Sequence, residues 1–317
     1  MFEGFETRRV RTSGPEIFLR TAGSGPAVLL IHGYPQNHAC WHAVAPKLAE
    51  HFTVVVPDLR GYGESGRPED DESHTVYAKR AMAGDLAEVM TALGHERFHV
   101  VGHDRGARVG YRLCLDHGAR VTRFCSLDVV PTLHMWDTID RARALGAFHW
   151  SFLAQPAPFP ETFIGFDPDG FHAHLMKSWA APGFEFDPDV KEACLAPLRT
   201  PDAIAATCAD YRAGADTDAE HDAADKAAGR KVQCPMLFLW GGARGFGGPV
   251  NKTGNEPPAH TDDAAPRTDP LDVWRAWCSA DVTGGPVNCG HFLPEEAPEQ
   301  VVAHLLEFLR PGGARRA

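Results

Sequence analysis

The sequence has no long hydrophobic run. Its first ten residues, MFEGFETRRV, lack the apolar stretch of a secretory signal, and no segment approaches the roughly 18 apolar residues that a membrane-spanning helix needs. We therefore expect a soluble, cytoplasmic protein that does not bind to membranes.

An excess of positive charge is also missing. The chain has 31 Lys and Arg against 42 Asp and Glu, which gives a net charge of −11 at pH 7. Proteins that bind nucleic acids or anionic membranes present a basic face. The charge balance therefore argues against both kinds of partner.

The cysteines lack close spacing. Eight of them are scattered through the 317 residues without a C-x-x-C motif, at positions 40, 114, 125, 194, 208, 234, 278 and 289. Zinc sites and disulfide-rich domains need clustered cysteines. We expect reduced, mostly buried thiols and no metal site.

Strands alternate with helices in the first third of the chain and again near its end. An apolar fraction of 44% and a charged fraction of 23% are typical of a globular protein. The pattern predicts a mostly parallel sheet of eight strands with helices on both faces. The first two expected strands form a hairpin around residues 13–15, and the other six lie near 27–33, 52–57, 97–102, 121–128, 234–242 and 280–287.

A helical insertion interrupts this alternation. Residues 133–229 have no strong β-branched run, and the segments QPAPFP, FDPDG and AAPG separate stretches with helical composition. We predict a core of residues 1–132 and 230–317 with a helical cap of residues 133–229. Residues 243–269 are dense in Gly, Pro, Asn, Thr and Asp, and we interpret them as a loop insertion within the core.

The segment Gly102-His103-Asp104-Arg105-Gly106 lies between an expected strand and an expected helix. It has the Gly-x-nucleophile-x-Gly form of a nucleophile elbow, in which glycines allow a tight turn. With Asp in place of Ser, the carboxylate can displace a leaving group from a saturated carbon and form an alkyl ester. The simpler alternative makes Asp104 an ordinary helix N-cap. The HGYP segment after an earlier strand and the late Gly290-His291 favour the nucleophile.

A base, an orienting acid and an oxyanion hole complete the expected machinery. His291 follows the last strand and would activate water against the ester, and Asp128, at the end of an earlier strand, would orient it. The alternatives are a surface histidine and a turn residue. The backbone N–H groups of Tyr34 and Arg105 would stabilise the oxyanion.

Arg105 and Arg108 are three residues apart at the start of the expected elbow helix. They can share one face beside Asp104, where two guanidinium groups and a helix N-terminus suit a small carboxylate. The alternative is that both are solvated surface arginines.

Seven segments together resemble one family: HGYPQ, DLRGYGESGRP, GHDRGARVGYRL, LDVVPT, FHW, DYRA and CGHFLPEEAPE. They resemble the fluoroacetate (haloacetate) dehalogenases of the α/β-hydrolase superfamily, over nearly the whole chain outside residues 243–269. The resemblance implies an α/β-hydrolase fold with an inserted helical cap. It also implies hydrolysis of haloacetate to glycolate and halide without a cofactor.

The resemblance assigns the same roles to Asp104, Arg105, Arg108, Asp128 and His291, and it adds His149, Trp150 and Tyr211 as halide ligands. Imidazole, indole and phenol groups offer three donors to a departing halide without a competing nucleophile. By composition alone, these three residues would be interpreted as cap packing and a surface helix position. The sequence leaves open whether the chain forms a homodimer, as members of this family often do.

The chain departs from the family at Tyr34, where the family commonly has Phe, and at the 243–269 insertion. One alternative is a dehalogenase restricted to chloro- or bromoacetate. Another is an epoxide hydrolase, although those enzymes use two cap tyrosines and only Tyr211 lies in the expected cap. A non-catalytic binding protein of the same fold would be expected to have lost a catalytic group, and none is missing here.

Overall fold

The structure, a computed structural model, describes residues 1–243 and 269–310. Its centre is an eight-stranded sheet in the order β1-β2-β4-β3-β5-β6-β7-β8. β1 and β2 form an antiparallel hairpin, β2 pairs antiparallel with β4, and all later pairs are parallel. The strands are β1 (Glu6–Arg11), β2 (Glu16–Ala22), β3 (Ala27–Ile31), β4 (Thr53–Pro57), β5 (Phe98–His103), β6 (Val121–Leu127), β7 (Met236–Gly241) and β8 (Val282–Val287).

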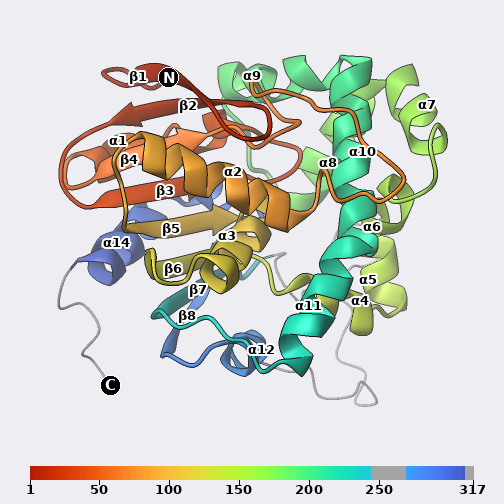
Figure 1. Ribbon diagram of the computed structural model, residues 1–317. Helices are drawn as coiled ribbons and strands as arrows, with labels where there is room; N and C mark the ends of the chain where they lie inside the picture. Colours follow the sequence, from red (N-terminus) through yellow and green to blue (C-terminus); the bar gives the residue numbers. More distant parts are fainter. Residues whose placement is uncertain (244–268, 311–317) are drawn as a thin grey trace.

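The inner parallel strands, such as β3 and β5, are buried on both faces because helices cover both sides of the sheet (Figure 1), whereas β8 at the edge of the sheet is largely exposed along its middle. Along β3, Leu29 packs on one side with α2 (Lys79–Ala92), α3 (Arg105–Asp116) and α12 (Pro270–Trp277). Its neighbour Leu30 packs on the other side with α1 (Ala45–Ala49) and α14 (Pro298–Leu309). Strand geometry sends successive side chains to opposite faces, which explains the continuous apolar runs in these strands.

Most helices between β6 and β7 gather beyond one end of the sheet, on the right of Figure 1, and α9 lies at the top of the view. They are α4 (Thr132–Asp137), α5 (Arg141–Gly146), α6 (Phe148–Leu153), α7 (Phe159–Phe166), α8 (Pro168–Trp179), α9 (Pro188–Leu198), α10 (Pro201–Ala215) and α11 (Thr217–Ala227). Several begin with proline in the first turn after an Asp or Thr N-cap. The FDPDG segment separates α7 from α8, as predicted, and its Asp167 also caps the start of α8.

The predicted strands and their order of appearance are confirmed. All eight cysteines are buried free thiols, as expected. No helix in the described part of the chain is long and apolar enough to cross a bilayer. The predicted insertion at 243–269 lies outside the described residues, except for its first and last positions.

Candidate active site

Asp104 lies at the junction of β5 and α3 with φ 49° and ψ −121°, a backbone conformation that is rare for residues other than glycine. The turn is tight. A Cβ atom on Gly102 would lie 2.5 Å from Ala107 Cα, and one on Gly106 would lie 2.3 Å from the carbonyl oxygen of His32. The two elbow glycines are therefore required by close backbone packing, and they hold Asp104 above the end of the sheet.

The Asp104 carboxylate is held by one of its two oxygens. Oδ1 accepts a hydrogen bond from the Tyr34 N–H at 2.9 Å, and a Cβ atom on Gly33 would lie only 2.5 Å from Asp104 Cβ. Arg105 supplies the first N–H of α3, which has no carbonyl partner within the helix. Burial opposes ionisation, but His291, Arg108 and Arg105 hold the pKa of Asp104 below its ordinary value. The carboxylate is therefore ionised at neutral pH.

His291 faces Asp104 and is oriented by Asp128. Its Nδ1 lies 2.6 Å from Asp128 Oδ2, and its Nε2, which has no hydrogen-bond partner among the described residues, lies 4.0 Å from Asp104 Oδ2. Asp128 is fixed in turn by the Gly241 N–H, which donates to its Oδ1 at 2.8 Å. Burial opposes protonation, but the hydrogen bond and charge of Asp128 raise the pKa of His291 above its ordinary value.

Arg105 is paired with Asp210 of α10. Its Nε and Nη2 donate to the two oxygens of the Asp210 carboxylate at 2.5 and 2.8 Å, and Nη2 also donates to the Asp210 carbonyl. Lys79 Nζ and the Tyr62 hydroxyl bind the same carboxylate. Burial alone would lower the pKa of Arg105, but the charge of Asp210 raises it well above its ordinary value.

Arg108 is equally buried, but no carboxylate in the described part of the chain forms an ion pair with it. Its Nη1 donates to the Val130 carbonyl at 2.6 Å, and its Nε has no hydrogen-bond partner among the residues that the structure describes. The guanidinium lies 4.5 Å from the centre of the Trp150 ring. Burial lowers the pKa of Arg108. A buried cation in this state is poised to bind an anion.

His149, Trp150 and Tyr211 form a contiguous group around the elbow. The ring of Tyr211 lies 5.5 Å from that of His149 and 6.3 Å from that of Trp150, and Arg105 lies 3.9 Å from the Tyr211 ring centre. No hydrogen bond joins these side chains to the described residues, so their donors are available. Burial lowers the pKa of His149 to about 3, which keeps the imidazole neutral with one N–H to donate.

Two residues of the site escaped the sequence reasoning. Trp179, at the end of α8, has its ring centre 4.5 Å from that of His149 and 5.5 Å from that of His291, so it lies between these two histidines. Asp210 is part of the DYRA motif at residues 210–213, but the motif by itself assigned it no role. The motif therefore pointed to Asp210, whereas no local sequence pattern identifies Trp179.

No group of three or more His, Cys, Asp or Glu side chains in the described ranges is arranged to hold a metal.

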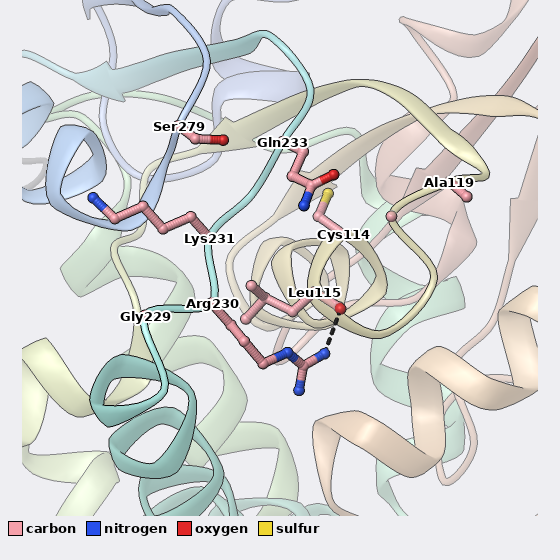
Figure 2. A pocket seen from close by; sticks show the side chains of 9 residues that line it. Cys114, Leu115, Ala119, Gly229, Arg230, Lys231, Gln233 and Ser279 are labelled. Atoms are coloured by element: carbon pink, nitrogen blue, oxygen red, sulfur yellow. Dashed lines mark hydrogen bonds between the residues drawn. The ribbon is translucent and has the colours of Figure 1, made fainter.

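A recess of about 480 Å³ lies at the other end of α3, where it is lined by Cys114, Leu115 and Lys231 (Figure 2). Arg230 donates across it to the Leu115 carbonyl at 2.5 Å. About ten residues of helix separate it from Asp104, which corresponds to roughly 15 Å. This recess therefore does not belong to the candidate active site.

Comparison with known proteins agrees with this geometry. Residues 26–298 match the family model for the alpha/beta hydrolase fold. The chain belongs to the α/β-hydrolase family. The predicted α/β-hydrolase fold is therefore confirmed, and the chain is a hydrolase of this family.

Individual relatives narrow the resemblance. The chain is 49% identical over 244 residues to the fluoroacetate dehalogenase of Burkholderia sp, covering 77% of this chain and 80% of that protein. It is 32% identical over 300 residues to the soluble epoxide hydrolase of Corynebacterium sp. (strain C12), covering 92% of each. A structure from Nostoc sp PCC 7120, assigned to the α/β hydrolases, matches with a TM-score of 0.88 at 44% identity. The match covers 98% of this chain and 99% of that one. The predicted similarity to haloacetate dehalogenases is thus confirmed. The chain is also similar, at lower identity, to an epoxide hydrolase.

Proposed function

We propose that this hydrolase removes halide from short 2-haloacids such as fluoroacetate, giving a 2-hydroxy acid. The observation that carries the proposal is Arg108, a buried guanidinium that has no carboxylate partner among the described residues and lies beside an ionised Asp104. A substrate carboxylate supplies the missing negative charge. The 49% identity to a fluoroacetate dehalogenase supports the same conclusion.

In the first step, Asp104 Oδ2 attacks the carbon that bears the halogen. A new C–O bond forms while the C–halogen bond breaks, and the halide leaves with the bonding electron pair. Oδ1 stays on the Tyr34 N–H. His149, Trp150 and Tyr211 donate to the departing halide, which matters most for fluoride because its charge is the most concentrated. Arg105 and Arg108 hold the substrate carboxylate meanwhile.

In the second step, His291 Nε2 takes a proton from water, and the hydroxide attacks Cγ of the Asp104 ester. The 4.0 Å between Nε2 and Asp104 Oδ2 suits a base that acts on water near this carboxyl group. The Tyr34 and Arg105 N–H groups stabilise the oxyanion. The ester C–O bond then breaks, and glycolate takes a proton from His291. The second proton of the water leaves the new Asp104 carboxyl group for solvent, which restores the carboxylate with one oxygen from water.

The test compares wild type with Asp104→Asn on fluoroacetate and chloroacetate, with released halide read by ion-selective electrodes. Fluoride from wild type but not from the variant supports the proposal. Chloride without fluoride limits the activity to the weaker carbon–halogen bonds. No halide from either acid contradicts it.

Epoxide hydrolysis is the second candidate, because the site holds a pair of donors that could protonate an epoxide oxygen. Tyr34 and Tyr211 have ring centres 5.3 Å apart, so a second tyrosine is present although it comes from the core. The 32% identity to a soluble epoxide hydrolase supports this candidate. A neutral epoxide leaves Arg108 unpaired, which favours haloacids. Diol formation from a small epoxide at a rate above that of halide release would make epoxide hydrolysis the first candidate and dehalogenation the second.

A further inference from the structure

Glu296 gathers three backbone N–H groups on one carboxylate. It lies at the end of α13 (Leu293–Glu296), and its Oε2 accepts from Gly290 at 2.7 Å and from Ala181 at 2.8 Å, while Oε1 accepts from Phe292 at 2.8 Å. A carboxylate that accepts several N–H bonds is a strong, directional anchor. The glutamate belongs to the CGHFLPEEAPE segment, and none of the roles described above uses it.

Two of these amides flank the catalytic base. Gly290 and Phe292 are the neighbours of His291, whose own N–H donates to the Trp179 carbonyl at 3.0 Å. All three consecutive N–H groups of this loop are therefore bound, two of them by Glu296. Without the carboxylate, two partly buried donors would lose their partners, which is costly enough for the loop to rearrange.

The third amide ties the loop to the cap. Ala181 follows α8, and a Cβ atom on Gly290 would lie 2.3 Å from the Ala181 nitrogen, so the two backbones are in close contact. The same cap segment carries Trp179, whose ring packs on His291. Glu296 thus fixes the base relative to both the core and the cap.

We propose that Glu296 is a positioning residue that holds His291 for hydrolysis of the ester on Asp104. This inference rests on the proposed function for its chemistry. The two catalytic steps should respond differently, because attack by Asp104 depends on the elbow between β5 and α3, whereas water activation depends on the loop that Glu296 holds.

Glu295 offers a matched control. It lies in the same short helix, but its carboxyl group bonds the side-chain amide of Gln36 and none of the three amides. Glu296→Gln and Glu295→Gln are the same substitution at adjacent positions. Burial raises the pKa of Glu295 to about 8, so Glu295→Gln removes little charge at pH 7 and controls for the change of side chain in this helix. Glu296→Asp is the second variant, because it keeps the charge while its shorter side chain cannot reach all three amides, and it serves if Glu296→Gln does not fold.

The experiment follows halide, glycolate and intact protein mass in single turnovers of fluoroacetate, with thermal unfolding as the folding check. For Glu296→Gln we expect one rapid equivalent of halide, hydrolysis slowed roughly 100-fold, and the Asp104 ester trapped in the mass spectrum. Glu295→Gln should behave as wild type. Equal slowing of both steps without ester, or the same defect in Glu295→Gln, would overturn the proposal.

A second readout needs no substrate and stays valid if the proposed function fails. The charge of Glu296 contributes, after those of Asp128 and Asp104, to the raised pKa of His291. NMR titration of the His291 imidazole, identified by its loss in His291→Asn, should show a lower pKa in Glu296→Gln than in wild type and no change in Glu295→Gln. An unchanged His291 pKa in Glu296→Gln would contradict the positioning role, whereas absence of halide from wild type would contradict only the proposed reaction.

Discussion

Arg105 and Arg108 lie one turn apart on α3, yet within the described chain only Arg105 has a carboxylate partner. Asp210 binds Arg105 through both of its oxygens, while Arg108 has a backbone carbonyl and the face of Trp150. The positive charge available to an anionic substrate therefore belongs mainly to Arg108. Arg105 contributes direction and a backbone N–H, and its charge is already balanced.

Arg108→Met should weaken the use of haloacids with little loss of stability. A hydrogen bond to a charged group contributes about 1.5–3 kcal/mol, so kcat/KM for chloroacetate should fall roughly 10- to 150-fold. The loss in the free energy of unfolding should be small, because within the described residues Arg108 has no carboxylate partner. Its Nη1 donates only to the Val130 carbonyl at 2.6 Å and to the Thr132 hydroxyl at 3.5 Å. Steady-state kinetics and urea unfolding measure the two quantities.

Arg112→Met is the control for that variant, since Arg112 lies one turn further along α3 and is paired with Asp222 and Asp225. It should lose stability and keep its KM. An Arg108→Met enzyme with unchanged kcat/KM would show that another group binds the substrate carboxylate.

Asp210→Asn should be strongly destabilising. Asp210 is fully buried and carries the charge that balances both Arg105 and Lys79. Removal of one partner from a buried ion pair costs about 3–5 kcal/mol. Chemical denaturation should show a loss of this size, together with a higher KM because Arg105 loses its orientation.

Asp218→Asn separates the loss of stability from the rise in KM that we expect for Asp210→Asn. Asp218 lies 3.2 Å from Lys79 Nζ and accepts the Lys79 backbone N–H, which an asparagine oxygen can still do, and it does not bind Arg105. We expect a smaller stability loss and an unchanged KM. Equal losses in the two variants would mean that Asp210 has no special role in the network.

The sequence predicted the parts of the site that depend on local order along the chain. The strand–elbow–helix arrangement, the base after the last strand and the acid after β6 are set by parallel strands that end at one edge, so Asp104, His291 and Asp128 meet as expected. The Arg105–Asp210 pair joins residues 105 positions apart, and the contact of Trp179 with His291 joins the end of α8 to the loop after β8. Such contacts depend on how the helices between β6 and β7 pack, which neither periodicity nor motif spacing encodes.

The activity of the wild type should rise with pH through the raised pKa of His291, because the base acts in its neutral form. Asp128→Asn removes the main cause of that rise, so the inflection should move to lower pH and the ester should accumulate. The stability of the fold should depend on pH in the opposite direction, with the contribution of His291 falling as pH rises. Protonated His291 contributes fully below its ordinary pKa of 6.5, and the contribution is lost as pH rises through the higher folded value.

Rate–pH profiles and urea unfolding across the same pH range check both expectations for Asp128→Asn. The pH-dependent contribution of His291 to the free energy of unfolding should largely disappear in this variant. If the profile of Asp128→Asn kept the wild-type inflection, His291 would not be the group that limits the reaction.

Gly33→Ala should abolish activity because it displaces the nucleophile and the backbone just before it, since the added Cβ atom would also lie 2.7 Å from the His103 carbonyl oxygen. A Cβ atom there would lie 2.5 Å from Asp104 Cβ and 2.6 Å from Oδ1, so the carboxylate must leave the Tyr34 N–H. Gly84→Ala is the matched control, because nothing lies within 4 Å of a Cβ at this position inside α2. It should keep full activity and add about 0.5–1 kcal/mol to the free energy of unfolding. Halide release and urea unfolding on the two variants give the comparison. A Gly33→Ala protein that still released halide at the wild-type rate would mean that Asp104 can attack without the hydrogen bond to Tyr34, and the oxyanion hole assigned to that amide would be wrong.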